Sequence, residues 1–200
     1  MARFLLFTAV LLQAHTAMVH AQKYEITPYV GWRTSSNLEE EATGATIDLK
    51  ETRSFGVIVS MQQKLGTHYD FLFSRQTTEL ESPNTLVNST SLRFDYYQIG
   101  GTVVYDHDQL HPFVTGGLGA THISPANPAF SSETNFSLSI GGGLKFPITR
   151  NVGLRLEVRG YGTVTDSEGS ILCADGGCYA KFKGSLFMQF EANAGLSIAF

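Results

Sequence analysis

The sequence is poor in charge and lacks long hydrophobic segments beyond its N-terminus. Charged residues make up 16% of the 200 residues, against 42% for hydrophobic ones. A chain with this composition is not disordered. Past the N-terminal segment no run reaches about 18 consecutive apolar residues, and the mean hydropathy is −0.02. These values exclude a bundle of membrane-spanning helices.

Basic residues are also scarce. Lys and Arg number 14 and Asp and Glu 18, which gives a formal net charge of −4. No basic stripe runs along the chain, so nucleic acid is not an expected partner. The 20 glycines and the 12% of aromatic residues instead favour a sheet-rich fold with close strand packing.

Cysteine is almost absent, since the chain has only Cys173 and Cys178. A metal site would need further ligands nearby in sequence, and none is present. A redox pair would have two intervening residues, whereas this pair encloses the longer segment Ala-Asp-Gly-Gly. The turn residues favour a short disulfide loop between Cys173 and Cys178. We predict no metal and no cofactor.

The first 21 residues form a separate segment. Arg3 precedes an apolar run at 4–12, and small residues end the segment at Ala21. This pattern predicts a signal peptide at 1–21 and one exported domain at 22–200, in an oxidising compartment. An N-terminal membrane anchor is the alternative, but the run is far shorter than the roughly 20 residues that span a bilayer.

The exported part alternates apolar and polar residues with a period of two, which is typical of half-buried strands. In the first segment Ile26, Val30 and Trp32 share one face, and Glu25 and Arg33 share the other. Eight such strands are predicted, of which the fifth is Gly-rich and the least regular. They lie at about 24–33, 54–62, 69–74, 91–105, 112–121, 135–146, 152–159 and 186–200.

The fourth strand has one irregularity. Tyr97, Ile99 and Val103 define its apolar face, but Leu92 and Phe94 have the opposite parity. This change of phase is consistent with a β-bulge near Asp95.

The predicted connections alternate between short and long. Short turns in the periplasm and long loops outside are the wiring of outer-membrane barrels, and an even strand count places both termini in the periplasm. The short connections lie at 64–66, 106–108 and 149–151, and the long ones at 34–51, 78–89, 123–134 and 163–183.

The last three strands separate apolar and charged residues onto two faces. One face has no charge along its whole length. A soluble barrel with its apolar face inward is compatible with this alternation. The pattern alone therefore does not decide whether the barrel lies in water or in a membrane.

The exported chain resembles the small outer-membrane β-barrel family of the opacity-protein and OmpA-barrel type. The resemblance covers about residues 24–200, and three segments carry it: 26–31 (ITPYVG), 112–120 (PFVTGGLGA) and 153–161 (GLRLEVRGY). It implies an all-β, eight-stranded, antiparallel up-and-down barrel that spans the outer membrane. The implied partners are outer-membrane lipids and the barrel-assembly machinery.

The C-terminus strengthens the resemblance. The chain closes on alternating apolar residues and a terminal aromatic, which looks like the assembly signal of outer-membrane barrels. Its members are Gly195, Leu196, Ile198 and Phe200.

A charged network is predicted on the inner face of the barrel. Arg155, Glu157 and Arg159 alternate along one strand and therefore share a face. The network is interpreted either as a structural ion-pair core, which we favour, or as a selectivity or proton path. The candidate residues are Glu25, Arg33, Lys145, Arg155, Glu157, Arg159 and Glu191.

Three further patterns suggest functional interpretations. His122, Ser124 and Glu133 carry the residue types of a hydrolytic triad, superficially similar to outer-membrane lipid A deacylases, but the prolines that follow do not match. The acidic residues 39–41 are expected on a solvated loop. Aromatic residues at the strand ends are expected to form interfacial girdles: Trp32, Tyr69, Tyr97, Tyr105 and Phe146.

We therefore expect a non-enzymatic outer-membrane barrel that displays its loops and has no wide pore. The family includes adhesins, structural barrels and small-solute channels, so a narrow channel for small solutes is the main alternative. A lipid-modifying hydrolase or a soluble lipocalin-like barrel is also compatible with parts of the pattern. The sequence indicates no specific extracellular ligand.

Overall fold

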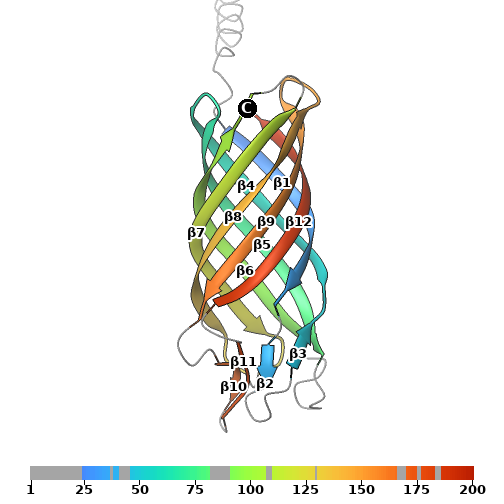
Figure 1. Ribbon diagram of the computed structural model, residues 1–200, viewed down its shortest axis with the longest axis vertical. Coiled ribbons are helices and arrows are strands. Elements are labelled where there is room, and N and C mark those ends of the chain that lie inside the picture. Colours follow the sequence, from blue (N-terminus) through green and yellow to red (C-terminus); the bar gives the residue numbers. More distant parts are fainter. Residues whose placement is uncertain are drawn as a thin grey trace, which may run out of the picture.

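Eight long antiparallel strands form a closed barrel in the computed structural model (Figure 1). The structure describes residues 24–36, 38–40, 46–81, 91–106, 110–128, 130–165, 170–174, 177–182 and 186–200, with the backbone alone at 38–40, 46–48, 81, 170–174 and 177–182. The predicted fold class is confirmed. The barrel strands are β1 (Tyr24–Ser35), β4 (Thr52–Lys64), β5 (Thr67–Glu81), β6 (Ser91–Val104), β7 (His111–Pro125), β8 (Glu133–Pro147), β9 (Val152–Val164) and β12 (Leu186–Ala199).

The barrel closes because every long strand pairs on both sides. The order around the wall is β1, β4, β5, β6, β7, β8, β9 and β12, and β12 returns to β1. Backbone hydrogen bonds join the first and last strands at their tips, with Phe200 N donating to Tyr24 O at 2.9 Å. A closed sheet leaves no unpaired edge along the wall, as a strand protein in lipid requires.

The two ends of the barrel differ. Tyr24, Phe200 and the three short connections lie at one end, which we call the terminal end (Figure 1). In one of these turns Gly66 has a φ of +76°, a conformation that disfavours residues with a side chain. The opposite ends of the strands, from which the long connections leave the wall, form the loop end.

Short strands at the loop end form an extension of the sheet that the sequence did not predict. They are β2 (Leu38–Glu40), β3 (Thr46–Leu49), β10 (Ser170–Ala174) and β11 (Gly177–Phe182). Their order is β10-β11-β2-β3, and β3 pairs with the end of β5. Parts of the first and last long loops are therefore joined by backbone pairing.

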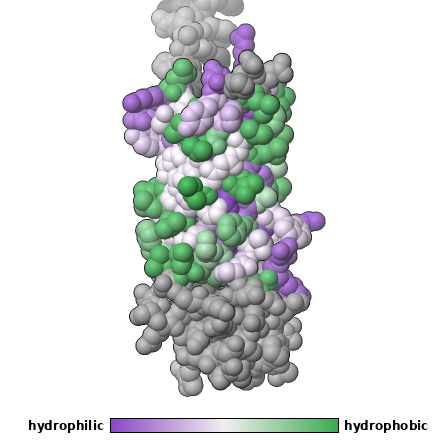
Figure 2. All heavy atoms as spheres, viewed as in Figure 1, coloured by the Kyte–Doolittle hydropathy of each residue, from purple (hydrophilic) through white to green (hydrophobic). Residues whose placement is uncertain are grey.

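Alternation places apolar side chains outside and polar ones inside. Outward residues such as Val30, Ile99 and Ile140 are exposed, Ile140 at 73%, whereas Thr27, Ser74 and most other inward polar residues are buried. Figure 2 shows hydrophobic side chains over much of the wall in view, with the most hydrophilic ones toward the two ends. The predicted faces are thus confirmed. Among the described residues, no helix has the length and apolarity to cross a bilayer.

β6 has no bulge near Asp95, so that expectation is wrong. Its pairing with β5 and β7 runs without a register shift from Leu92 to Val103. Leu92 and Phe94 point inward together with Tyr96, and all three are completely buried. Their parity reflects an apolar section inside the barrel rather than a change of phase.

The Gly-rich strand β7 is regular and longer than predicted. A Cβ at Gly119 would lie 2.0 Å from the Tyr97 carbonyl oxygen, and one at Gly100 would lie 2.0 Å from that of Gly116. Glycine therefore permits the close approach of β6 and β7.

Candidate functional site

The candidate site is the barrel interior, which is filled by side chains in layers. Nearest the terminal end, Lys145 on β8 donates a hydrogen bond to Glu25 on β1, with 2.7 Å between Nζ and Oε1. Thr27 and Ser197 lie beside this pair, with their hydroxyl oxygens 3.1 Å apart. This ion pair crosses the lumen between strands that are not neighbours in the wall.

The middle layer is built around one carboxylate on β9. Glu157 accepts hydrogen bonds from Arg155 Nε at 2.8 Å and from Arg159 Nε at 2.5 Å. Arg159 also donates to Ser139 on the neighbouring strand β8 and to Thr115 on β7. Because residues i, i+2 and i+4 of a strand share a face, the predicted spacing places all three charges together.

The next layer joins β1 to β12 through Arg33 and Glu191. Arg33 Nε donates to Glu191 Oε2 at 2.9 Å, and both side chains are fully buried. The Arg33 guanidinium carbon lies 4.7 Å from the ring centroid of Tyr161 and 5.0 Å from that of Tyr96. A buried cation that faces a carboxylate and two aromatic rings is compensated in the way a low-dielectric interior demands.

The loop-end section of the lumen is apolar, and we call it the apolar cap. Its centre is the stacked pair of Phe94 and Phe187, with 5.6 Å between ring centroids. The cap comprises Leu49, Leu80, Leu92, Phe94, Ile123 and Phe187, all buried, and Phe130 packs against it. The cap fills the loop-end section of the lumen with buried apolar side chains.

All seven predicted network residues point into the lumen. They form three separate ion-pair groups along the barrel rather than one continuous network: Glu25 with Lys145, Arg155 with Glu157 and Arg159, and Arg33 with Glu191. These ion pairs fill the lumen with paired charge.

Several interior residues were missed by the sequence reasoning. Tyr96 donates to Gln189 at 2.7 Å, and Gln189 donates to Gln76 at 3.1 Å. Thr102 donates to Asp70, so Asp70 is a fourth lumen carboxylate. Their inward parity was the available signal, but uncharged polar residues on an inner face stand out less than charges do.

The His-Ser-Glu pattern does not assemble into a triad. His122 and Ser124 point outward, and His122 Nδ1 lies 2.8 Å from the hydroxyl oxygen of Thr134. Glu133 has the inward parity of Ser137 and Ser139 on the same strand. In the described part of the chain, His, Cys, Asp and Glu form no cluster of three suited to a metal ion.

The remaining predicted sites have mixed outcomes. Cys173 and Cys178 are Cα partners in the β10–β11 hairpin, but their side chains lie outside the described ones, so the disulfide stays a prediction. The signal peptide also lies outside the described residues. Phe200 is exposed and stacks on Tyr24 with ring centroids 6.3 Å apart.

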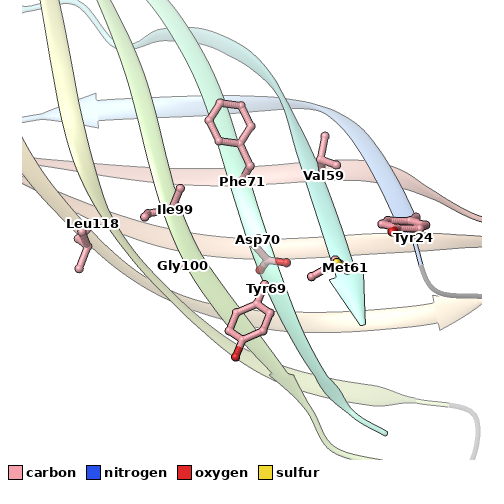
Figure 3. A pocket seen from close by; sticks show the side chains of 9 residues that line it. All are labelled: Tyr24, Val59, Met61, Tyr69, Asp70, Phe71, Ile99, Gly100 and Leu118. Atoms are coloured by element: carbon pink, nitrogen blue, oxygen red, sulfur yellow. The ribbon is translucent and has the colours of Figure 1, made fainter. Parts of the chain in front are cut away.

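The described surface of the barrel has depressions of different size. One of about 520 Å³ lies on the apolar exterior over strands β1, β4, β5, β6 and β7, with outward side chains such as Phe71, Ile99 and Leu118 and with Gly100 along it (Figure 3). A smaller one, of about 160 Å³, lies at the terminal end beside the Glu25–Lys145 pair.

Comparison with known proteins adds a family and a fold. Residues 5–184 match the family described as "Outer membrane protein beta-barrel domain". No curated protein matches this chain.

Solved barrels share the fold at low sequence identity. The crystal structure of the outer membrane protein OprG from Pseudomonas aeruginosa matches with a TM-score of 0.64 at 10% identity, covering 90% of this chain and 96% of OprG. Neisserial surface protein A (NspA) gives 0.61 at 13% identity, with 88% and 97% covered. AlkL in DMPC bilayers gives 0.54 at 14%, with 91% and 92% covered.

Proposed function

We propose, from the premise that this chain belongs to the outer membrane protein β-barrel family and lies in the outer membrane, that it anchors and displays surface loops without forming a wide pore. The observation that carries the proposal is the filled lumen, in which three ion-pair groups and the apolar cap follow one another along the axis. Eight-stranded barrels leave an interior that side chains can fill.

The charges of the filled lumen support a structural rather than a conducting role. Four described cations, Arg33, Lys145, Arg155 and Arg159, share the interior with four carboxylates, Glu25, Asp70, Glu157 and Glu191. A permeating ion would have to compete with pairs that compensate each other in a low-dielectric interior. A narrow channel would need these pairs and the cap to open together.

Loop display depends on orientation. The family's wiring places short turns in the periplasm, so the loop end faces outward. An epitope tag inserted between β5 and β6 should be detected by antibody on intact cells. The same tag inserted between β6 and β7, at the terminal end, should be detected only after permeabilisation. The reverse labelling would overturn the orientation and, with it, the display role.

We assign the C-terminal residues Gly195, Leu196, Ile198 and Phe200 to recognition by the barrel-assembly machinery. The Phe200 side chain is exposed, and its hydrogen bonds to Tyr24 are made by the backbone. Packing in the folded barrel therefore gives little reason for a phenylalanine at this position. Deleting Phe200 should reduce the folded yield in cells while detergent refolding in vitro stays normal. The matched control is deletion of Tyr24, the opposite member of the same stack. Equal yields for the Phe200 deletion and the unaltered chain would contradict the assignment.

The disulfide is a further part of the proposal. Cys173 and Cys178 stand opposite each other in a hairpin outside the closed wall, which suits a loop-stabilising bridge. Thiol alkylation of denatured, unreduced protein should modify neither cysteine, and both should react after reduction. Modification without reduction would show that the bridge is absent.

A further inference from the structure

Three arginines face outward on neighbouring strands near the loop end. Arg53 lies on β4, Arg75 on β5 and Arg93 on β6, and all three have the parity of the exposed apolar residues on their strands. Arg75 is the Cα partner of Phe55, two residues from Arg53, and of Asp95, two residues from Arg93. Two strand spacings, about 10 Å, separate the outer strands of the group, so the three long side chains can reach one ligand. We call these residues the arginine cluster.

One carboxylate organises the cluster without neutralising it. Asp95 accepts two hydrogen bonds from Arg75, from Nε at 2.6 Å and from Nη2 at 2.8 Å. An Asp95 carboxylate oxygen also lies 3.3 Å from Arg93 Nε. The Asp95 side chain is only 3% exposed, whereas Arg75 and Arg93 are 34% and 44% exposed. The acid is therefore covered while the guanidinium groups stay accessible. Among the described side chains none pairs with Arg53.

Two nearby acids whose side chains the structure describes have other partners. Glu79 on β5 pairs with Lys50 at 3.0 Å, and Glu51 accepts a hydrogen bond from Trp32 Nε1 at 3.3 Å. His122 lies opposite Asp95 and contacts Thr134. With Asp95 and Glu51 both counted against its three arginines, the arginine cluster keeps one excess positive charge beside the membrane-facing wall.

The cluster is confined to one side of the barrel. The described outward positions of β8, β9, β12 and β1 have no charged side chain. Below the cluster the wall is apolar: Phe73 packs against Tyr97 with ring centroids 5.2 Å apart, and Arg75 lies over Phe73 at 5.5 Å. Trp32, a residue type enriched at membrane interfaces, is the strand partner of Arg53.

We propose that Arg53, Arg75 and Arg93 bind the phosphate-bearing headgroup of a lipid in the outer leaflet. Arginine forks match phosphate oxygens in geometry and charge. A lipid presents both parts that this surface accommodates, a headgroup anion at the arginines and acyl chains against the apolar wall below them. The proposal rests on the outer-membrane location and on the loop end facing outward, and it does not depend on the lumen being closed.

Trp32 provides a direct probe, because it is the only tryptophan in the chain and lies beside Arg53. The mature protein is reconstituted in phosphatidylcholine vesicles with a minor fraction of phosphatidic acid whose acyl chains are brominated near the headgroup. Quenching of Trp32 is compared with that by identically brominated phosphatidylcholine. Each arginine near a charged lipid surface contributes roughly a fivefold preference, so phosphatidic acid should be preferred at least about fivefold.

The double variant Arg53→Gln with Arg93→Gln should lose this preference, while Arg150→Gln, at the terminal end, should retain it. Equal quenching by the two lipids, or a preference unchanged in the double variant, would overturn the proposal. Equal loss in Arg150→Gln would also overturn it, since net charge alone would then suffice. Displacement by inorganic phosphate would contradict the lipid as ligand.

Folding of each variant is checked by its heat-dependent shift in gel mobility. If the double variant does not fold, Arg93→Gln alone serves, with an expected preference reduced roughly fivefold. An unchanged preference in that single variant would count against the proposal.

Discussion

The terminal-side and loop-side sections of the lumen are closed by different interactions, although the same eight strands line both. Toward the terminal end and the middle, ion pairs such as Glu25–Lys145 and Arg33–Glu191 fill the interior. Toward the loops, Phe94 and Phe187 stack within the apolar cap. The charged section depends on the completeness of each pair, because a lone buried charge is costly. The cap depends on volume, because a void in a packed cluster loses contacts.

Removal of one shared carboxylate is expected to have the largest effect. Glu157→Ala leaves Arg155 and Arg159 without the carboxylate that both contact, which should lower the free energy of unfolding by about 3–5 kcal/mol. Urea unfolding of the reconstituted barrel measures this. Glu79→Gln breaks an exposed pair as a control and should cost under about 1 kcal/mol. Similar values for the two would mean that lumen pairing does not stabilise the barrel.

A charge on the outer wall is expected to cost slightly less. Leu156 points outward in the middle of β9, between the inward Arg155 and Glu157. Leu156→Arg should destabilise by about 2–4 kcal/mol, as cations at the bilayer midplane do. Ser139→Asn, on the inner face of β8, should cost less in the same unfolding assay. Equal costs would mean that the two faces are misassigned.

The cap should respond to shape rather than to charge. Phe94→Leu keeps the site apolar but leaves a void beside Phe187, so it should cost about 1 kcal/mol or more. Phe136→Leu on the outer wall is the matched control and should cost less, because lipid fills the space. An effect at Phe136 as large as that at Phe94 would argue against tight packing inside the cap.

Replacement of a whole pair should have the smallest effect and sharpen the comparison most. Arg33→Met combined with Glu191→Met removes both charges and keeps the section filled, so stability should change by less than about 1 kcal/mol or increase. Arg33→Met alone should be strongly destabilising. If the double variant were as unstable as the single one, the pair would have a role beyond filling the lumen.

The sequence predicted the wall well because its two faces differ in residue class along every strand. The charged inner residues were identified from parity alone, since Arg155, Glu157 and Arg159 alternate with leucine and valine. The apolar cap was missed for the same reason. Leu92 and Phe94 have the parity of the lumen, and an apolar residue on the polar face cannot be distinguished locally from a bulge.

The connections were predictable only in length. The short strands β2, β3, β10 and β11 pair across two loops far apart in sequence, and no local periodicity marks such pairing. The ion-pair partners Glu25 and Lys145 were likewise assigned to one face but not to each other. Partner choice depends on the stagger of the closed barrel, which a single strand does not encode.

Single-channel recording tests the central claim, a lumen closed by paired charges and an apolar cap, most directly. The protein from residue 22 onward is inserted into a planar bilayer under high salt, with a wide porin as the positive control. We expect no stable conductance steps from the unaltered chain under conditions in which the porin conducts. Reproducible steps, abolished when the protein is heat-denatured before insertion, would contradict the closed lumen and favour a narrow channel.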